Sequence, residues 1–145
     1  MKGHKFAIDI SRSGFSCARV FAITIEDESY DIKYILTILN SKLIKFFLQH
    51  ISPLKQGGFY TYSSSTLSQT PIKNISPEKQ KPFINLSDKM LSLNKKLQEI
   101  GDKNTLEKQK LQEEIKKTDS EIDELVYQLY GITEEEKKII EESLK

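Results

Sequence analysis

The chain has few of the residues on which catalytic and metal-binding proteins most often rely. Its 145 residues include one cysteine, two histidines and no tryptophan. A single cysteine, Cys17, excludes an intramolecular disulfide and any zinc site built from several cysteines. It fits a reducing cytosol. No apolar run is long enough to span a membrane, and the first residues lack the apolar core of a secretory signal peptide, so we expect neither.

Recognisable catalytic motifs are also missing. Neither His4 nor His50 has a metal-binding partner three or four residues away, and Cys17 has no adjacent His or acid that would mark a nucleophile. A Gly-rich phosphate loop is absent, and so is the Asn-Pro-Pro-aromatic motif of adenine methyltransferases. We therefore expect no catalytic site in this chain, and a free-standing enzyme is the least favoured function class.

Charge is distributed unevenly along the chain. Residues 1–81 hold 9 Lys and 2 Arg against 6 acids, a net charge of +5, whereas residues 82–145 hold 11 Lys against 15 acids, a net charge of −4. A basic half can attract a polyanion while the acidic half faces elsewhere. The length fits one domain, or one small domain with an appendage.

The first half has a mixed pattern. Alternating apolar residues predict two strands within the first 30 residues. Apolar residues spaced three and four apart predict one helix over 32–51, which should end before Pro53. Leu39 and Leu43 are expected among its most buried residues. Gly57-Gly58 predicts a tight turn and 59–62 a strand, followed by an extended segment over 70–75.

The second half is helical in pattern. Heptad spacing over residues 83–100 and 105–130, with turn residues at 101–104, predicts an antiparallel helical hairpin. Gly131 should terminate its second helix, and Thr133 with Glu136 should begin a short last helix. We therefore predict an α+β fold, in which a small mixed sheet packs on a helix and a coiled-coil-like hairpin and short C-terminal helix follow. The predicted division is 1–81 and 82–145.

One segment of the first half combines basic and aromatic residues. Seven Lys and a single acid lie between residues 32 and 81. Lysines suit contacts with phosphate groups, and polar side chains such as that of Gln56 suit contacts with base edges. The candidate DNA-binding residues are Lys42, Lys45, Lys55, Gln56, Tyr60, Tyr62 and Lys73. The alternative is a solvated strand edge that lysines protect from aggregation.

Five segments in a particular order carry a family resemblance. They are YILTILNSKLI (34–44), ISPLKQGG (51–58), PI (71–72), KPFI (81–84) and IDELVYQLYGITEEE (122–136). In this order they resemble the C-terminal specificity domain, or target-recognition domain, of type IIG restriction–modification enzymes that carry an adenine-specific DNA methyltransferase. The specificity subunits of type I systems are similar. The resemblance extends over about residues 5–144.

The resemblance implies a role in recognising double-stranded DNA in the cytoplasm of a prokaryote. Residues 1–81 would be a partial target-recognition domain, and 82–145 a helical spacer and docking region. The chain would need no cofactor, because S-adenosylmethionine and a divalent metal are expected on a methyltransferase or nuclease domain or subunit that the chain lacks. We accordingly expect a C-terminal fragment of a larger enzyme. The alternative function is a helical interaction module that pairs with a partner or with itself and does not bind DNA.

Overall fold

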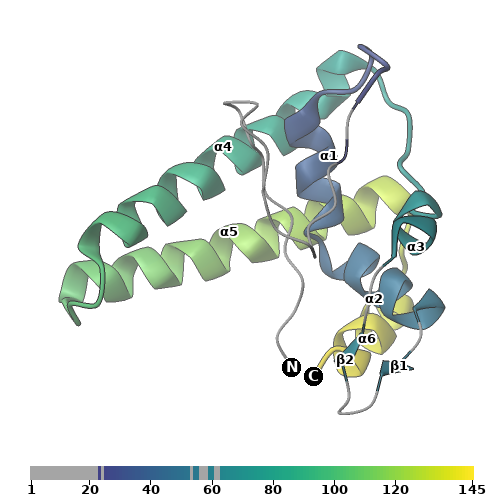
Figure 1. Ribbon diagram of the computed structural model, residues 1–145. Helices are drawn as coiled ribbons and strands as arrows, with labels where there is room; N and C mark the ends of the chain where they lie inside the picture. The colour runs from purple at the N-terminus through teal and green to yellow at the C-terminus, as the bar shows by residue number, and fades with distance from the viewer. Residues whose placement is uncertain (1–22, 24, 53, 56–58, 61–62) are drawn as a thin grey trace.

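The computed structural model describes residues 23, 25–52, 54–55, 59–60 and 63–145, and helices dominate them (Figure 1). The elements are α1 Ile32–Leu39, α2 Lys42–Ile51, β1 Leu54–Lys55, β2 Phe59–Tyr60, α3 Ser64–Ser68, α4 Pro77–Ile100, α5 Leu106–Tyr130 and α6 Glu134–Ser143. The long helices α4 and α5 meet at the hairpin turn and diverge away from it, and α1 packs against α4. Helices α2, α3 and α6 gather at the end of α5 that lies away from the hairpin turn.

The predicted α+β class is wrong, because the described part of the chain is all-helical in architecture. Its only extended pairing is antiparallel and two residues long on each side, with Leu54 opposite Tyr60 and Lys55 opposite Phe59. This is much shorter than an ordinary strand of about five residues and cannot form a layer. The hydrophobic core of the described part is instead formed between helices. The two strands expected within the first 30 residues fall almost entirely outside the described residues, as does the Gly57-Gly58 turn.

The single helix predicted over 32–51 is in fact two helices. Helix α1 stops at Leu39, and Ser41 begins α2 by accepting a hydrogen bond from the Ile44 backbone N–H at 3.4 Å. The Ser41 hydroxyl also donates to the Ile38 carbonyl oxygen at 2.6 Å and is fully buried. A serine that bonds nearby backbone groups offers the chain an alternative to a continuous helix. The predicted end of the second helix before Pro53 is confirmed.

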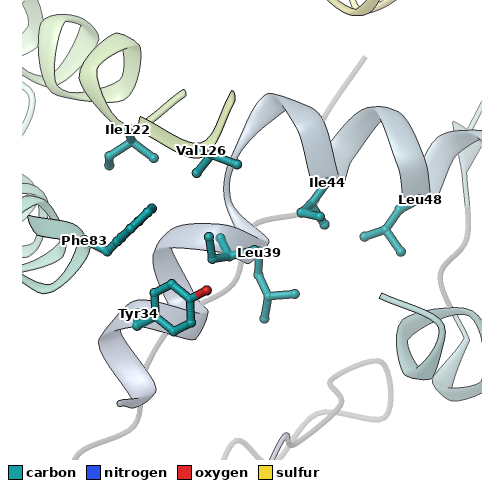
Figure 2. Close-up of a cluster of buried hydrophobic side chains, with 8 residues drawn as sticks. Tyr34, Leu39, Ile44, Leu48, Phe83, Ile122 and Val126 are labelled. Atoms are coloured by element: carbon teal, nitrogen blue, oxygen red, sulfur yellow. The ribbon is translucent and has the colours of Figure 1, made fainter. Parts of the chain in front are cut away.

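The core lies where α1 and α2 meet the N-terminal part of α4 and the C-terminal part of α5 (Figure 2). Its buried apolar residues are Tyr34, Ile38, Leu39, Ile44, Leu48, Phe83, Ile122 and Val126. The Tyr34 and Phe83 rings meet edge to face with their centroids 5.2 Å apart. Leu39 is buried as predicted, whereas Leu43 is only partly buried, because the break before α2 turns Ile44 and Leu48 inward instead.

Gln80 joins the start of α4 to the segment before α1. Its side-chain amide donates to the carbonyl oxygens of Ser29 and Ile75 at 2.7 and 3.0 Å, and its Oε1 accepts from the Asp31 N–H at 2.9 Å. The residue is 1% exposed. Three of its hydrogen-bonding positions are therefore satisfied inside the protein, as a buried amide requires.

The predicted antiparallel hairpin is confirmed. Helix α4 ends at its C-cap Gly101, α5 begins after the N-cap Thr105, and the two helices contact each other. Helix α4 continues through Pro82 without restarting. Gly131 closes α5 in the left-handed conformation with φ 66°, and Thr133 and Glu136 form the capping box of α6. Both of these helix-end signals are as predicted.

The distal half of the hairpin differs in burial from its base. Residues 88–117, which we call the arm, contain no fully buried residue, whereas Ser87 and Thr118 immediately next to them are buried. In the arm only two helices pack together. Their apolar seam stays half exposed, because a third element would be needed to cover it. The core thus combines residues from 1–81 and 82–145, and the division at that boundary stays a prediction.

Replacing Ile38 tests the core. Ile38 is 0% exposed, so Ile38→Ala should lower the free energy of unfolding by about 2–5 kcal/mol. Ile32 lies on the same helix but is 46% exposed, and Ile32→Ala should cost well under about 1 kcal/mol. Urea denaturation followed by circular dichroism measures both variants. Equal losses would show that α1 does not bury the face assigned here.

Replacing Gln80 tests the junction between α4 and the chain before α1. Gln80→Met keeps the side-chain length but leaves the Asp31 N–H and the Ser29 carbonyl without a partner. Each unsatisfied group costs about 1–3 kcal/mol when it stays buried. Gln98→Met, at an exposed position of the same helix, is the matched control and should be nearly neutral. An unfolding midpoint that is the same in both variants would contradict the structural role of Gln80.

Candidate nucleic-acid interface

Helix α2 has one side in the core and one side toward solvent. Ile44 and Leu48 are buried, and side chains three and four residues apart share a helix face. The residues outside this buried stripe are half-buried or exposed. Apart from Phe47, which packs against the core, the polar and aromatic ones are Lys42, Lys45, Phe46, Gln49 and His50. We call these five residues the outer side of α2.

Lys42 is held by acids of two other helices. Its backbone N–H, at the first position of α2, donates to Asp123 Oδ1 at 2.8 Å. Its ammonium lies 3.7 Å from Asp123 Oδ2 and 3.6 Å from Glu141 Oε1. A carboxylate at a helix N-terminus bonds an otherwise unpaired N–H and complements the helix dipole. Burial raises the pKa of the Asp123 carboxyl above its ordinary value, and the contacts with Lys42 act in the opposite direction. Lys42 therefore has an internal role in docking α2 on α5.

Lys73 also makes internal contacts. Its ammonium donates to the Leu129 carbonyl oxygen at 3.0 Å, in the last turn of α5, where a cation complements the helix dipole. Its backbone N–H donates to Tyr130 Oη at 3.2 Å, and its carbonyl oxygen accepts from the Tyr34 hydroxyl at 2.6 Å. Burial raises the pKa of the Tyr34 phenol, which keeps this hydroxyl a donor. Lys73 thus fastens the extended segment after α3 to both α1 and α5.

The remaining predicted residues lie on α2 and around the β1–β2 hairpin. Lys45 is half-buried on the outer side of α2 and forms no ion pair within the described part of the chain. Lys55 and Tyr60 belong to β1 and β2, for which the structure describes the backbone. Gln56 and Tyr62 lie outside the described residues. Helix α2 leads into the hairpin through Ser52, so the chain connects Lys45 to Lys55 over a short distance in sequence.

A pair of rings on the outer side of α2 was not predicted from the sequence. The Phe46 and His50 rings lie with their centroids 4.1 Å apart at an interplanar angle of 41°. His50 Nδ1 lies 2.8 Å from the Phe46 carbonyl oxygen, and His50 is exposed. The signal was the four-residue spacing on the helix face opposite Ile44 and Leu48. From the sequence, His50 was considered only as a metal ligand.

The described residues contain no group of three or more His, Cys, Asp or Glu side chains placed to hold a metal ion. An open groove of about 360 Å³ lies on the arm, lined by Asn94, Leu97, Gln112, Ile115 and Lys116. None of the predicted DNA-binding residues lines this groove. No helix within the described ranges has the length and apolar character needed to cross a membrane.

Comparison with known proteins gives one family. Residues 2–72 match the model of the TaqI-like C-terminal specificity domain. The match includes α1, α2, the β1–β2 hairpin and α3, and it ends before α4. No curated protein and no solved structure matches the chain. The matched region contains Lys42, Lys45 and the hairpin residues, whereas Lys73 follows directly after it. Over residues 2–72, the chain belongs to the family of TaqI-like C-terminal specificity domains.

Proposed function

We propose that the chain binds double-stranded DNA through the outer side of α2 and the β1–β2 hairpin, and so selects the target sequence of a restriction–modification enzyme. A DNA target-recognition role in such enzymes follows from the specificity domain at residues 2–72, which is the observation that carries the proposal. That domain contains both elements of the proposed face. The outer side of α2 adds cationic and hydrogen-bonding groups suited to a polyanion.

The lysines of this face differ in what else they bind. Lys42 and Lys73 already contact α5, so contacts of either with phosphate would compete with bonds that hold the fold. Lys45 forms no ion pair within the described ranges, and Lys55 comes two residues before Gly57-Gly58 in the sequence. We therefore assign phosphate contacts first to Lys45 and Lys55. Gln56 remains the proposed contact with a base edge, and Tyr60 and Tyr62 remain proposed parts of the same face.

Catalysis belongs elsewhere in this proposal. An adenine that is to be methylated must leave the base stack, so a recognition module has to hold the duplex in register while another part of the enzyme acts. S-adenosylmethionine and a divalent metal would be bound by that methyltransferase or nuclease part. The chain described here would contribute the choice of sequence and the position of the DNA.

Salt-dependent binding tests the proposed face. The full chain should bind a duplex with an affinity that falls as salt rises, because bound lysines release counterions from the phosphates. Lys45→Ala and Lys55→Ala should each reduce the salt slope by roughly one unit. Fluorescence anisotropy with a labelled duplex at a series of salt concentrations measures the slope.

Lys95→Ala is the control for this experiment, because Lys95 is an exposed lysine of the arm and should leave the slope unchanged. Lys73→Ala should mainly lower the unfolding midpoint, since it removes the bond to the Leu129 carbonyl oxygen. If Lys95→Ala reduces the slope as much as Lys45→Ala and Lys55→Ala do, binding is spread over the whole surface and the proposed face is wrong.

A second function, self-association, is favoured by the arm. Its apolar seam is only half covered, and Leu91 and Leu106 are 38% and 68% exposed. Two such arms placed side by side would cover each other's seams, as helices do in a four-helix bundle. We propose this pairing of two copies as an addition to DNA recognition. The alternative is that the same seam binds a methyltransferase or nuclease subunit.

Sedimentation velocity tests the pairing of arms. The full chain should sediment as a dimer at high concentration, and Leu91→Ser with Leu106→Ser should return it to a monomer. Ile139→Ser is the matched control, because Ile139 is 60% exposed but lies on α6, outside the arm. A wild-type chain that is monomeric at every concentration would rule out self-association through this surface.

A further inference from the structure

His50 is an exposed histidine whose ring is held in place by its own helix. Its Nδ1 is 2.8 Å from the Phe46 carbonyl oxygen, four residues earlier in α2. Its ring also lies against the Phe46 ring, at 4.1 Å between centroids. A hydrogen bond together with a ring contact restricts both side-chain torsions of an otherwise mobile surface residue. The imidazole is therefore already oriented before any ligand binds.

The hydrogen bond also determines which ring nitrogen carries the proton. A carbonyl oxygen can only accept, so Nδ1 must donate. In the neutral imidazole the other nitrogen, Nε2, then has a free lone pair and acts as an acceptor. The structure thus places an oriented hydrogen-bond acceptor on the surface at the C-terminal end of α2.

The position of this acceptor connects it with the proposed DNA face. His50 lies in the last turn of α2, two residues before Ser52, from which the chain enters the β1–β2 hairpin. Phe46 is not among the residues packed on the core, so the ring pair is not part of the hydrophobic interior. Lys45, which forms no ion pair within the described ranges, precedes Phe46 directly. An oriented acceptor and a cation therefore share one helix at the edge of the proposed face.

We infer that His50 contacts a base edge, with Nε2 accepting a hydrogen bond from the exocyclic amino group of an adenine or a cytosine in the major groove. These are the two bases that present an amino donor there, so a neutral imidazole acceptor separates them from guanine and thymine at one position. Phe46 acts as a positioning residue, because its ring and carbonyl oxygen hold the imidazole. The inference rests on the proposed DNA-recognition function and adds a specificity residue to it.

The test selects duplexes from a random pool with the full chain and counts the bases retained at each position. His50→Phe keeps an aromatic ring on Phe46 but removes the Nε2 acceptor. This variant should lose a preference for adenine or cytosine at one position, by about three- to tenfold, which is the range of a single hydrogen bond. Preferences at the other positions and the salt slope should stay as in the wild type.

Asn94→Leu is the matched control. The Asn94 side chain donates to the Met90 carbonyl oxygen at 2.8 Å, the same four-residue geometry on an exposed helix face, but it lies on the arm. It should leave every base preference unchanged. The thermal unfolding midpoint of each variant separates an effect on recognition from an effect on the helix.

Two outcomes would overturn the inference. If His50→Phe retains the wild-type preferences while Lys45→Ala and Lys55→Ala still change the salt slope, His50 is not a base contact and the proposed function stands. If His50→Phe weakens binding equally to all sequences, its role is structural or electrostatic. A wild-type chain that retains no duplex at any salt concentration would instead remove the proposed function, and this inference with it.

Discussion

Ser41 interrupts an apolar segment that would otherwise continue as one helix, and the corner it forms decides which residues of α2 meet the core. Its hydroxyl bonds the Ile38 carbonyl oxygen and caps Ile44, so that both helix ends are satisfied within a buried turn. The carboxylate of Asp123, on α5, accepts a hydrogen bond from the backbone N–H of Lys42 at the first position of α2. Without this corner, the stripe that buries Ile44 and Leu48 would not be directed against α5 and α6. This corner therefore determines which side of α2 faces away from the core.

The specificity domain is supported by helices beyond the region that the family match covers. Phe83 of α4 and Ile122 and Val126 of α5 complete the core that Tyr34 and Ile38 begin (Figure 2). Hydrogen bonds between Gln80 and Asp31 and between Lys73 and Tyr34 cross the same boundary. Residues far apart in sequence thus form one packed unit at the base of the hairpin. A force or ligand that shifts α5 would therefore act on α1 and α2 through contacts that already exist.

Local signals predicted the helical half well. The heptad spacing, the Gly131 cap and the Thr133–Glu136 capping box depend on residues within one or two turns of each other, and all three are present. The break at Ser41 was missed, because apolar residues continue at helical spacing on both sides of it. The sheet was overpredicted from residues with high strand propensity, such as Phe59 and Tyr60, which pair over only two residues.

Contacts between distant residues explain what the sequence could not reveal about the candidate site. Lys42 and Lys73 were predicted as DNA ligands from the local charge, the Gly-Gly turn and the family resemblance, yet their partners are Asp123, 81 residues away, and Leu129, 56 residues away. Nothing in the local pattern indicates either pairing. The orientation of His50 depends on a partner only four residues away, but its significance depends on which face of α2 the core covers.

Contacts between the two halves also neutralise part of the basic charge of residues 1–81. Acids of the second half pair with lysines of the first, Asp88 with Lys33 and Asp123 and Glu141 with Lys42. Paired charges produce a weaker field at a distance than isolated ones, so these lysines contribute less to the attraction of a polyanion. Lys45, on the outer side of α2, forms no such pair in the described part of the chain. The acidic half thus neutralises Lys33 and Lys42, whereas the charge of Lys45 on the outer side of α2 is not neutralised by an ion pair in the described ranges.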